Sequence, residues 1–228
     1  MLPRRNGKPA LVTLAIGVLS GVVSAQPILI TEVFVNLDEV SDAAAERFEV
    51  FNPCLDPVDL RGLTIRNETG APHTITAVAP VLVPPQSFAV LGRDADPLIN
   101  GGVPVGYEYS GSVSINNGGD SIIIERDGEL VDAFEYDGSD VRSGVSLSLD
   151  PSQSLSPICN DDLPNCCDAT IVLSGTMLGT PGELNTVCAG VGMTCDPVVR
   201  ASDSLADANG DGAVTPGDFN AWIRAFNS

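Results

Sequence analysis

Between residues 27 and 187 the chain consists of short runs rich in Val, Ile, Leu and Phe, each ended by Gly, Pro, Asn or Asp. This region does not repeat its apolar residues at the spacing of an amphipathic helix. Short apolar runs bounded by turn residues are typical of β-strands, and a long succession of them predicts an all-β domain. The clearest strands are predicted at 28–36, 47–51, 64–66, 87–91, 121–126 and 129–136.

The last two predicted strands flank the pair Asp127-Gly128. This pair favours a tight hairpin, because both residues accept the left-handed backbone conformation that such a turn needs. After the turn, Leu130, Asp132, Phe134 and Tyr136 alternate with Val131, Ala133 and Glu135. The alternation and the regular spacing of the strands predict a β-sandwich.

Six phrases in this region follow one another in an order that resembles the lamin-tail domain family. They are E-R-F-E-V-F-N-P at 46–53, V-D-L-R-G-L-T-I at 58–65, V-P-P-Q-S-F-A-V-L-G at 83–92, I-N-N-G-G-D at 115–120, V-D with Tyr136 at 131–136, and G-T-P-G-E-L-N at 179–185. The resemblance implies an immunoglobulin-like β-sandwich over 27–187, and we expect Val58, Leu60 and Leu63 in its core. The chain departs from the family at Leu63, where tryptophan is usual, and in a cysteine-rich insertion at 159–167.

The first 25 residues are typical of a secretory signal peptide. Arg4, Arg5 and Lys8 precede an apolar run from Ala10 to Val23, and Val23-Ser24-Ala25 offers small residues for cleavage. The alternative is a membrane-anchoring helix, which needs an apolar run of about 20 residues. Because this run is shorter and contains two glycines, we expect cleavage and a secreted or cell-surface protein without membrane insertion.

All six cysteines lie in the part of the chain that would be exported, at Cys54, Cys159, Cys166, Cys167, Cys188 and Cys195. An even number of cysteines outside the cell favours disulfides over zinc. The adjacent Cys166-Cys167 also lacks the two-residue gap of paired zinc ligands, and the single histidine is remote. We expect three bridges among about fifteen possible connectivities. Short loops from Cys159 to Cys166 or Cys167, and from Cys188 to Cys195, would leave Cys54 for the remaining cysteine.

The chain carries 30 acidic residues against 11 lysines and arginines, and its formal net charge is −19. Beyond the signal segment it contains no lysine. Nucleic acids and anionic membranes would repel such a chain, so neither is an expected partner. We favour a role of this charge in solubility over an acidic binding surface, which is the alternative.

Near the C-terminus, Asp207-Ala-Asn209-Gly-Asp211-Gly212 has the spacing of a calcium loop. Such a loop offers oxygen ligands at alternate positions and turns sharply at its sixth residue, which is Gly212 here. The predicted Ca²⁺ ligands are Asp207, Asn209, Asp211, the carbonyl of Ala213, Thr215 and Asp218. The alternative is an acidic turn before a helix, because Asn-Gly and Asp-Gly are ordinary turn pairs.

This loop and the helix expected after it resemble the repeat of dockerin modules, which have the pattern D-x-N-x-D-G-x-V and an aspartate at the twelfth place. A typical dockerin has two repeats, whereas this chain has one. The resemblance implies a calcium-dependent module at 205–228, joined by a linker at 188–204, that attaches the protein to an extracellular receptor or scaffold. At helical spacing, Phe219, Trp222, Ile223 and Phe226 share one face, which either binds the partner or packs within the module.

The sequence contains no G-x-S-x-G, H-E-x-x-H or phosphate-binding glycine motif. We expect His73 to lie in a loop without a catalytic role. The acids Asp94, Asp96, Glu125, Asp132, Asp161 and Asp162 are expected at solvated strand edges and turns. The sequence therefore indicates a non-enzymatic binding or structural protein. The alternatives are an extracellular hydrolase or hydrolase accessory protein acting on polysaccharide or nucleic acid, and a calcium-responsive matrix protein without a specific receptor.

Overall fold

The computed structural model describes residues 28–189 except positions 154, 156, 158 and 162. Its strands are β1 (Leu29–Phe34), β2 (Arg47–Phe51), β3 (Val58–Asp59), β4 (Leu63–Arg66), β5 (His73–Thr74), β6 (Leu82–Val83), β7 (Phe88–Gly92), β8 (Tyr107–Glu108), β9 (Gly119–Arg126), β10 (Glu129–Asp137), β11 (Leu147–Leu149), β12 (Cys166–Asp168), β13 (Val172–Ser174) and β14 (Met177–Leu178). The helical elements of this part are short: α1 (Asp42–Ala45), η1 (Ser110–Ser112) and η2 (Leu163–Asn165). The prediction of an all-β domain is confirmed. The predicted signal peptide and calcium module lie outside the described residues.

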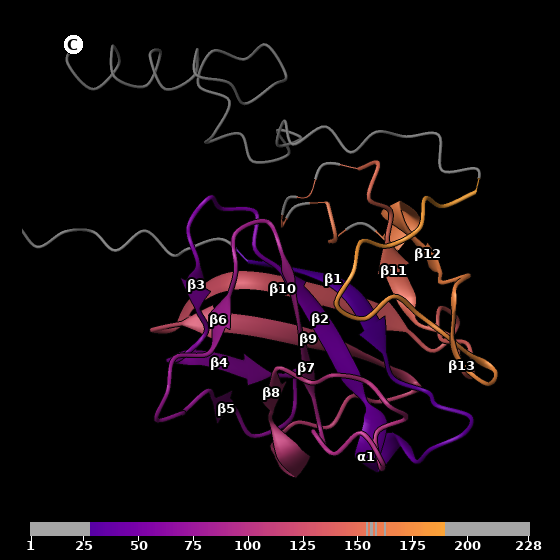
Figure 1. The fold of residues 1–228 in the computed structure, drawn as a ribbon, viewed down its shortest axis with the longest axis horizontal. Helices are drawn as coiled ribbons and strands as arrows, with labels where there is room; N and C mark the ends of the chain where they lie inside the picture. The colour runs from indigo at the N-terminus through magenta and orange to yellow at the C-terminus, as the bar shows by residue number, and fades with distance from the viewer. Residues whose placement is uncertain (1–27, 154, 156, 158, 162, 190–228) are drawn as a thin grey trace, which may run out of the picture.

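Two sheets contain most of these strands (Figure 1). The larger sheet has the order β12-β11-β1-β2-β7-β8, and the smaller has the order β10-β9-β4-β5. Neighbouring strands are antiparallel except β7 and β8, which are parallel. The long strands β9 and β10 cross the direction of β1 and β2 (Figure 1). Two small pairs, β3 with β6 and β13 with β14, complete the described strands.

One hydrophobic core joins the two sheets. Phe48 on β2 and Phe134 on β10 belong to the same cluster, and each is at most 1 % exposed. The predicted core residues Val58, Leu60 and Leu63 are buried in this cluster as well. Burial of one such side chain stabilises a fold by about 1.5–3 kcal/mol, so this shared core is what holds the sheets together.

The pair Asp127-Gly128 forms the hairpin between β9 and β10 that the sequence predicts. Asp127 has a φ of 54° and Gly128 a φ of 83°, so both adopt the left-handed conformation. The pairing register shifts between Leu130 and Asp132, which marks a bulge. Alternate residues of β10 are buried from Asp132 onward, whereas Leu130 is 64 % exposed. The predicted alternation is therefore confirmed beyond the bulge and is wrong for Leu130.

Asn52 follows β2 and anchors the neighbouring β3–β6 pair. The residue is fully buried, and its Nδ2 donates to the carbonyl oxygens of Asp56 at 2.9 Å, Val83 at 3.0 Å and Pro84 at 3.0 Å. Its Oδ1 accepts a hydrogen bond from the backbone N–H of Cys54 at 2.9 Å. One amide therefore ends a strand of the larger sheet and also fixes the position of a separate strand pair.

Cys167, on β12, forms a disulfide with Cys188. The backbone N–H of Cys188 also donates to Asp150 Oδ2 at 3.2 Å, which holds Cys188 against the end of β11. The expected loops from Cys188 to Cys195 and from Cys159 to Cys167 are therefore wrong, because Cys188 and Cys167 pair with each other. Cys159 is disulfide-bonded too, whereas Cys54 carries a free thiol, so the expected third bridge through Cys54 is also wrong.

Candidate functional site

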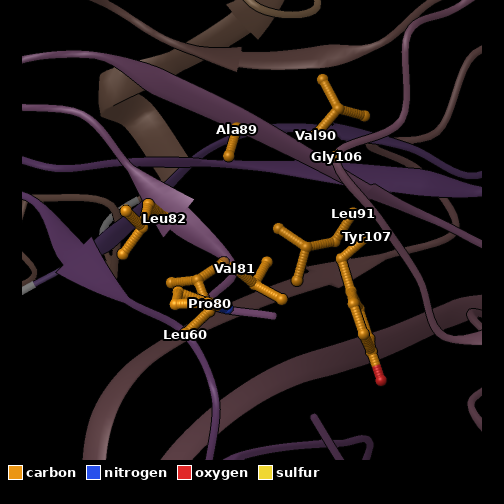
Figure 2. Close-up of a pocket in the computed structure, with 9 residues that line it drawn as sticks. All are labelled: Leu60, Pro80, Val81, Leu82, Ala89, Val90, Leu91, Gly106 and Tyr107. Atoms are coloured by element: carbon orange, nitrogen blue, oxygen red, sulfur yellow. The ribbon is translucent and has the colours of Figure 1, made fainter. Parts of the chain in front are cut away.

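An open apolar groove lies between the β3–β6 pair and the β7–β8 edge of the larger sheet (Figure 2). Leu60 and residues 80–82 line one side, and residues 89–91, Gly106 and Tyr107 line the other. The groove has a volume of about 380 Å³. The side chains drawn in Figure 2 are hydrocarbon except for the hydroxyl of Tyr107. This groove is therefore suited to hold an apolar group and offers little for proton transfer.

The hydroxyl of Tyr107 is engaged by His73. The Nε2 atom of His73 lies 2.8 Å from the Tyr107 hydroxyl oxygen, and the backbone N–H of Thr76 donates to the same oxygen at 3.4 Å. Burial lowers the pKa of His73 below its ordinary value, so the ring is neutral at pH 7. The expectation that His73 lies in a loop is wrong, because it forms β5 and links this edge of the smaller sheet to β8.

A second hollow, of about 360 Å³, is polar and is lined by Glu68, Asp120 and Glu135 among others. Glu68 and Glu135 are exposed to solvent. The Oδ2 atom of Asp120 accepts hydrogen bonds from the side-chain amides of Asn67 at 3.1 Å and Asn116 at 2.5 Å. A catalytic acid is usually held in an apolar setting that keeps it protonated. These carboxylates are instead solvated or bound by amides, as expected for a turn.

Two buried glutamates face each other across β1 and β2. Glu32 and Glu49 are partners in the register of these strands, and each is at most 2 % exposed. The segment 179–185 binds both: Thr180 donates from N and Oγ1 to Glu32 Oε2 at 2.8 Å, and Gly182 N donates to Glu49 Oε2 at 2.5 Å. Burial, and next the charge of Glu32, raise the pKa of Glu49 well above its ordinary value. The pair thus anchors the segment that closes the fold.

Arg47 lies on β2 beside these glutamates and is 2 % exposed. Its guanidinium carbon is 4.3 Å from the centroid of the Phe34 ring, and Nη1 donates to the carbonyl oxygen of Ala45 at 3.1 Å. Burial lowers the pKa of Arg47 to about 10, and the nearby charge of Glu32 opposes this, so Arg47 stays protonated at neutral pH. The gap between these side chains and Pro181 is too small to admit a water molecule. We infer that this buried polar cluster is structural.

Asp132 is the acid whose environment differs most from the sequence-based expectation. It was expected at a solvated edge, but it is 2 % exposed and accepts hydrogen bonds from Ile30 N and Asn160 Nδ2. Asp132 alternates in step with the buried Phe134 and Tyr136, so it lies on the inner face of β10 although its residue type favours solvent. The expectation holds for Asp96 and Asp161, which are exposed, and Glu125 pairs with Arg66 at 2.6 Å on a partly exposed strand.

The residues predicted to bind Ca²⁺ and to form the apolar docking face lie at 207–226, outside the described part of the chain. Within residues 28–189, apart from the four excluded positions, no three His, Cys, Asp or Glu side chains gather as a metal site. The same residues contain no helix long and apolar enough to cross a membrane.

The sequence did not single out Glu32, Asn160 or Tyr107. Glu32 gave a weak signal, because it is an acid inside the continuous apolar run of the first strand, where charge is costly unless it is bonded. Asn160 and Tyr107 each form a hydrogen bond with a residue more than 30 positions away in the sequence. Local sequence patterns do not reveal such contacts.

Comparisons of the chain with protein families, with curated proteins and with solved structures found no match.

We expect the free energy of unfolding to fall as the pH rises above 4.5, partly through Glu49. Because its pKa is higher in the folded than in the unfolded state, the folded protein keeps a proton that the unfolded chain has released, which lowers stability by up to about 1.4 kcal/mol per pH unit. Glu49→Gln should flatten this slope, and the exposed Glu135→Gln should not. Urea unfolding at several pH values measures this pH dependence of the unfolding free energy. Equal slopes in wild type and Glu49→Gln would contradict the assignment.

Proposed function

We propose that this chain is a secreted, non-enzymatic binding or structural protein. In this proposal, a lamin-tail-like, immunoglobulin-like β-sandwich is displayed outside the cell. A single calcium-dependent, dockerin-like module at 205–228 attaches it to an extracellular receptor or scaffold.

The observation that supports a non-enzymatic function is that the buried acidic side chains bind other segments of the fold. Glu32 and Glu49 bind the closing segment 179–185, and Asp132 binds β1 and Asn160, so each of these three buried carboxyls serves the fold. The apolar groove of Figure 2 has no carboxylate in its lining. A hydrolase would need acids that converge on a substrate-sized opening. The described geometry favours binding over hydrolysis.

Three observations support the sandwich part of the proposal. The two sheets share one core, the phrases at 46–53 and 58–65 supply part of it, and the phrase at 179–185 binds Glu32 and Glu49, of which Glu49 alternates with the core residues Phe48 and Val50 on β2. These contacts give each of the three phrases a physical role in one fold. The Cys167–Cys188 disulfide fits an oxidising compartment, and therefore export after removal of the signal segment.

The attachment part of the proposal is tested with the mature protein and an Asp207→Ala/Asp211→Ala variant. Calorimetric titration with Ca²⁺ measures binding to the loop directly. The mature protein is then used as bait on cell-envelope and culture-medium fractions, with calcium or with a chelator. We expect wild type to bind Ca²⁺ and to retain a partner only when calcium is present, and the variant to do neither.

The matched control is Asp94→Ala/Asp96→Ala, which removes two acids from a surface loop of the described domain. It should bind Ca²⁺ and retain the partner as wild type does. If the protein binds Ca²⁺ but retains no partner, Ca²⁺ serves folding only, and the attachment proposal is refuted. A partner retained equally by wild type and the loop variant would move the binding surface to the sandwich.

A further inference from the structure

Asp132 and Asn160 form a buried polar contact between three segments. The Oδ2 atom of Asp132 accepts hydrogen bonds from the backbone N–H of Ile30 at 2.6 Å and from Asn160 Nδ2 at 2.7 Å. Asn160 Nδ2 also donates to the carbonyl oxygen of Ile30 at 2.9 Å. Asp132 is 2 % exposed and Asn160 is 0 % exposed. The contact therefore links β10 of the smaller sheet, β1 of the larger sheet and the segment after Cys159.

Each of the two side chains has one oxygen without a hydrogen-bond partner among the described residues, Asp132 Oδ1 and Asn160 Oδ1. Both atoms are buried, and as an ionised carboxylate and an amide carbonyl both can only accept. The two donor positions of Asn160 Nδ2 are already used by Ile30 O and Asp132 Oδ2, which fixes the orientation of the amide. An unsatisfied buried acceptor costs about 1–3 kcal/mol, so two of them on side chains that already share a hydrogen bond indicate a missing donor.

A metal ion and a proton could each satisfy these oxygens. A Ca²⁺ ion needs about six to eight oxygen ligands, and no three metal-ligating side chains come together in the described part of the chain. A proton needs only one additional acceptor. A carboxylic acid and a primary amide can form two parallel hydrogen bonds, with N–H donating to one carboxyl oxygen and O–H donating to the amide oxygen. The proton explains both unsatisfied oxygens without any added ligand.

We propose that Asp132 is a neutral carboxylic acid at physiological pH and that its Oδ1–H donates to Asn160 Oδ1. The pair is then a proton-dependent latch that joins both sheets to the segment after Cys159. When Asp132 loses the proton, this donor disappears and an unpaired negative charge remains in the protein interior.

The electrostatic surroundings agree with this geometry. Burial first, and the charge of the neighbouring Asp161 as well, raise the pKa of Asp132 to about 8 against the hydrogen bonds from Ile30, Asn160 and the backbone of Ala133. Asp161 is the charged side chain that acts on Asp132. The folded protein keeps this proton between pH 3.8 and about 8, whereas the unfolded chain releases it near pH 3.8. Over that range the folding equilibrium constant should fall by up to about tenfold per pH unit, and the fall should end near the folded-state pKa.

The direct test is a ¹³C NMR titration of the side-chain carboxyl carbon of Asp132 in the full mature chain, assigned by comparison with Asp132→Asn. We expect its shift to remain that of a neutral acid through pH 7 and to change near pH 8. A titration midpoint below about pH 5 would overturn the proposal. This readout uses the wild-type fold, so it decides the question even if a variant does not fold.

The stability test compares wild type with Asp132→Asn and with the exposed-site control Asp127→Asn. An asparagine at 132 can donate permanently to Asn160 Oδ1 while its own oxygen accepts from Ile30 N. The folding constant of wild type should therefore fall about a hundredfold more between pH 6 and pH 9 than that of Asp132→Asn. Identical pH dependence in the two proteins would refute the latch. Repeating the titration with chelator in the Asp207→Ala/Asp211→Ala background reveals a bound cation: a midpoint that changes with calcium would also overturn the proposal.

Discussion

Replacing Asn52 with alanine should lower the free energy of unfolding by about 3–5 kcal/mol. The substitution removes the four hydrogen bonds that the Asn52 amide makes with Asp56, Val83, Pro84 and Cys54. It leaves the buried carbonyl of Val83 and three part-buried backbone groups without these partners, and a buried group left unpaired costs about 1–3 kcal/mol. Urea unfolding at constant pH measures the loss.

The matched control for Asn52→Ala is Asn117→Ala. Asn117 is exposed, and its Nδ2 donates to the carboxylate of Asp42 at 2.8 Å. Its loss should cost less than about 1 kcal/mol, because an exposed hydrogen bond is replaced by water. Similar losses in the two variants would show that the β3–β6 pair does not depend on the buried amide of Asn52.

Replacing both Cys167 and Cys188 with serine should lower the free energy of unfolding by about 3 kcal/mol. The two cysteines are 21 positions apart, and a bridge over a loop of that length reduces the conformational entropy of the unfolded chain by roughly this amount. The loss should appear in denaturant unfolding under oxidising conditions and should disappear when wild type is compared with the variant in reductant.

Cys54→Ser is the control for this double variant. Cys54 has a free thiol and is partly buried, so its replacement should change the unfolding free energy by less than about 1 kcal/mol. If Cys54→Ser destabilised the protein as strongly as the double variant, disulfide exchange through Cys54 would be the explanation, and the assigned pairing would be wrong.

The strands were predictable because their signals are local. The hairpin at Asp127-Gly128 needs two residues that accept positive φ, and the sequence places both side by side. The predicted core residues Val58, Leu60 and Leu63 lie close to turn residues that fix their direction. Leu130 is exposed, against the predicted alternation, because a bulge inserts one residue between it and Asp132. A bulge without glycine has no clear local signature in the sequence.

The buried polar contacts could not be predicted, because each joins residues distant in sequence. Asp132 was assigned to solvent from its residue type, whereas its partners Ile30 and Asn160 are 102 and 28 positions away. The disulfide was misassigned for a related reason. Short cysteine loops are cheap to close, but the pairing of β12 with β11 brings Cys167 to Cys188 instead. Both the contacts of Asp132 and the pairing of Cys167 with Cys188 depend on how distant strands come together, and not on spacing along the chain.

The Cys167–Cys188 bridge also determines how the domain would respond to mechanical tension. A pull applied at Cys188 passes through a covalent bond to β12. The residues between the two cysteines form a closed loop, so tension cannot lengthen them. The hydrogen bonds that Thr180 and Gly182 make to the buried glutamates are inside this loop and are shielded from the load. A load that reaches Cys188 would therefore pull on the β12 edge of the larger sheet and leave the closing segment in place.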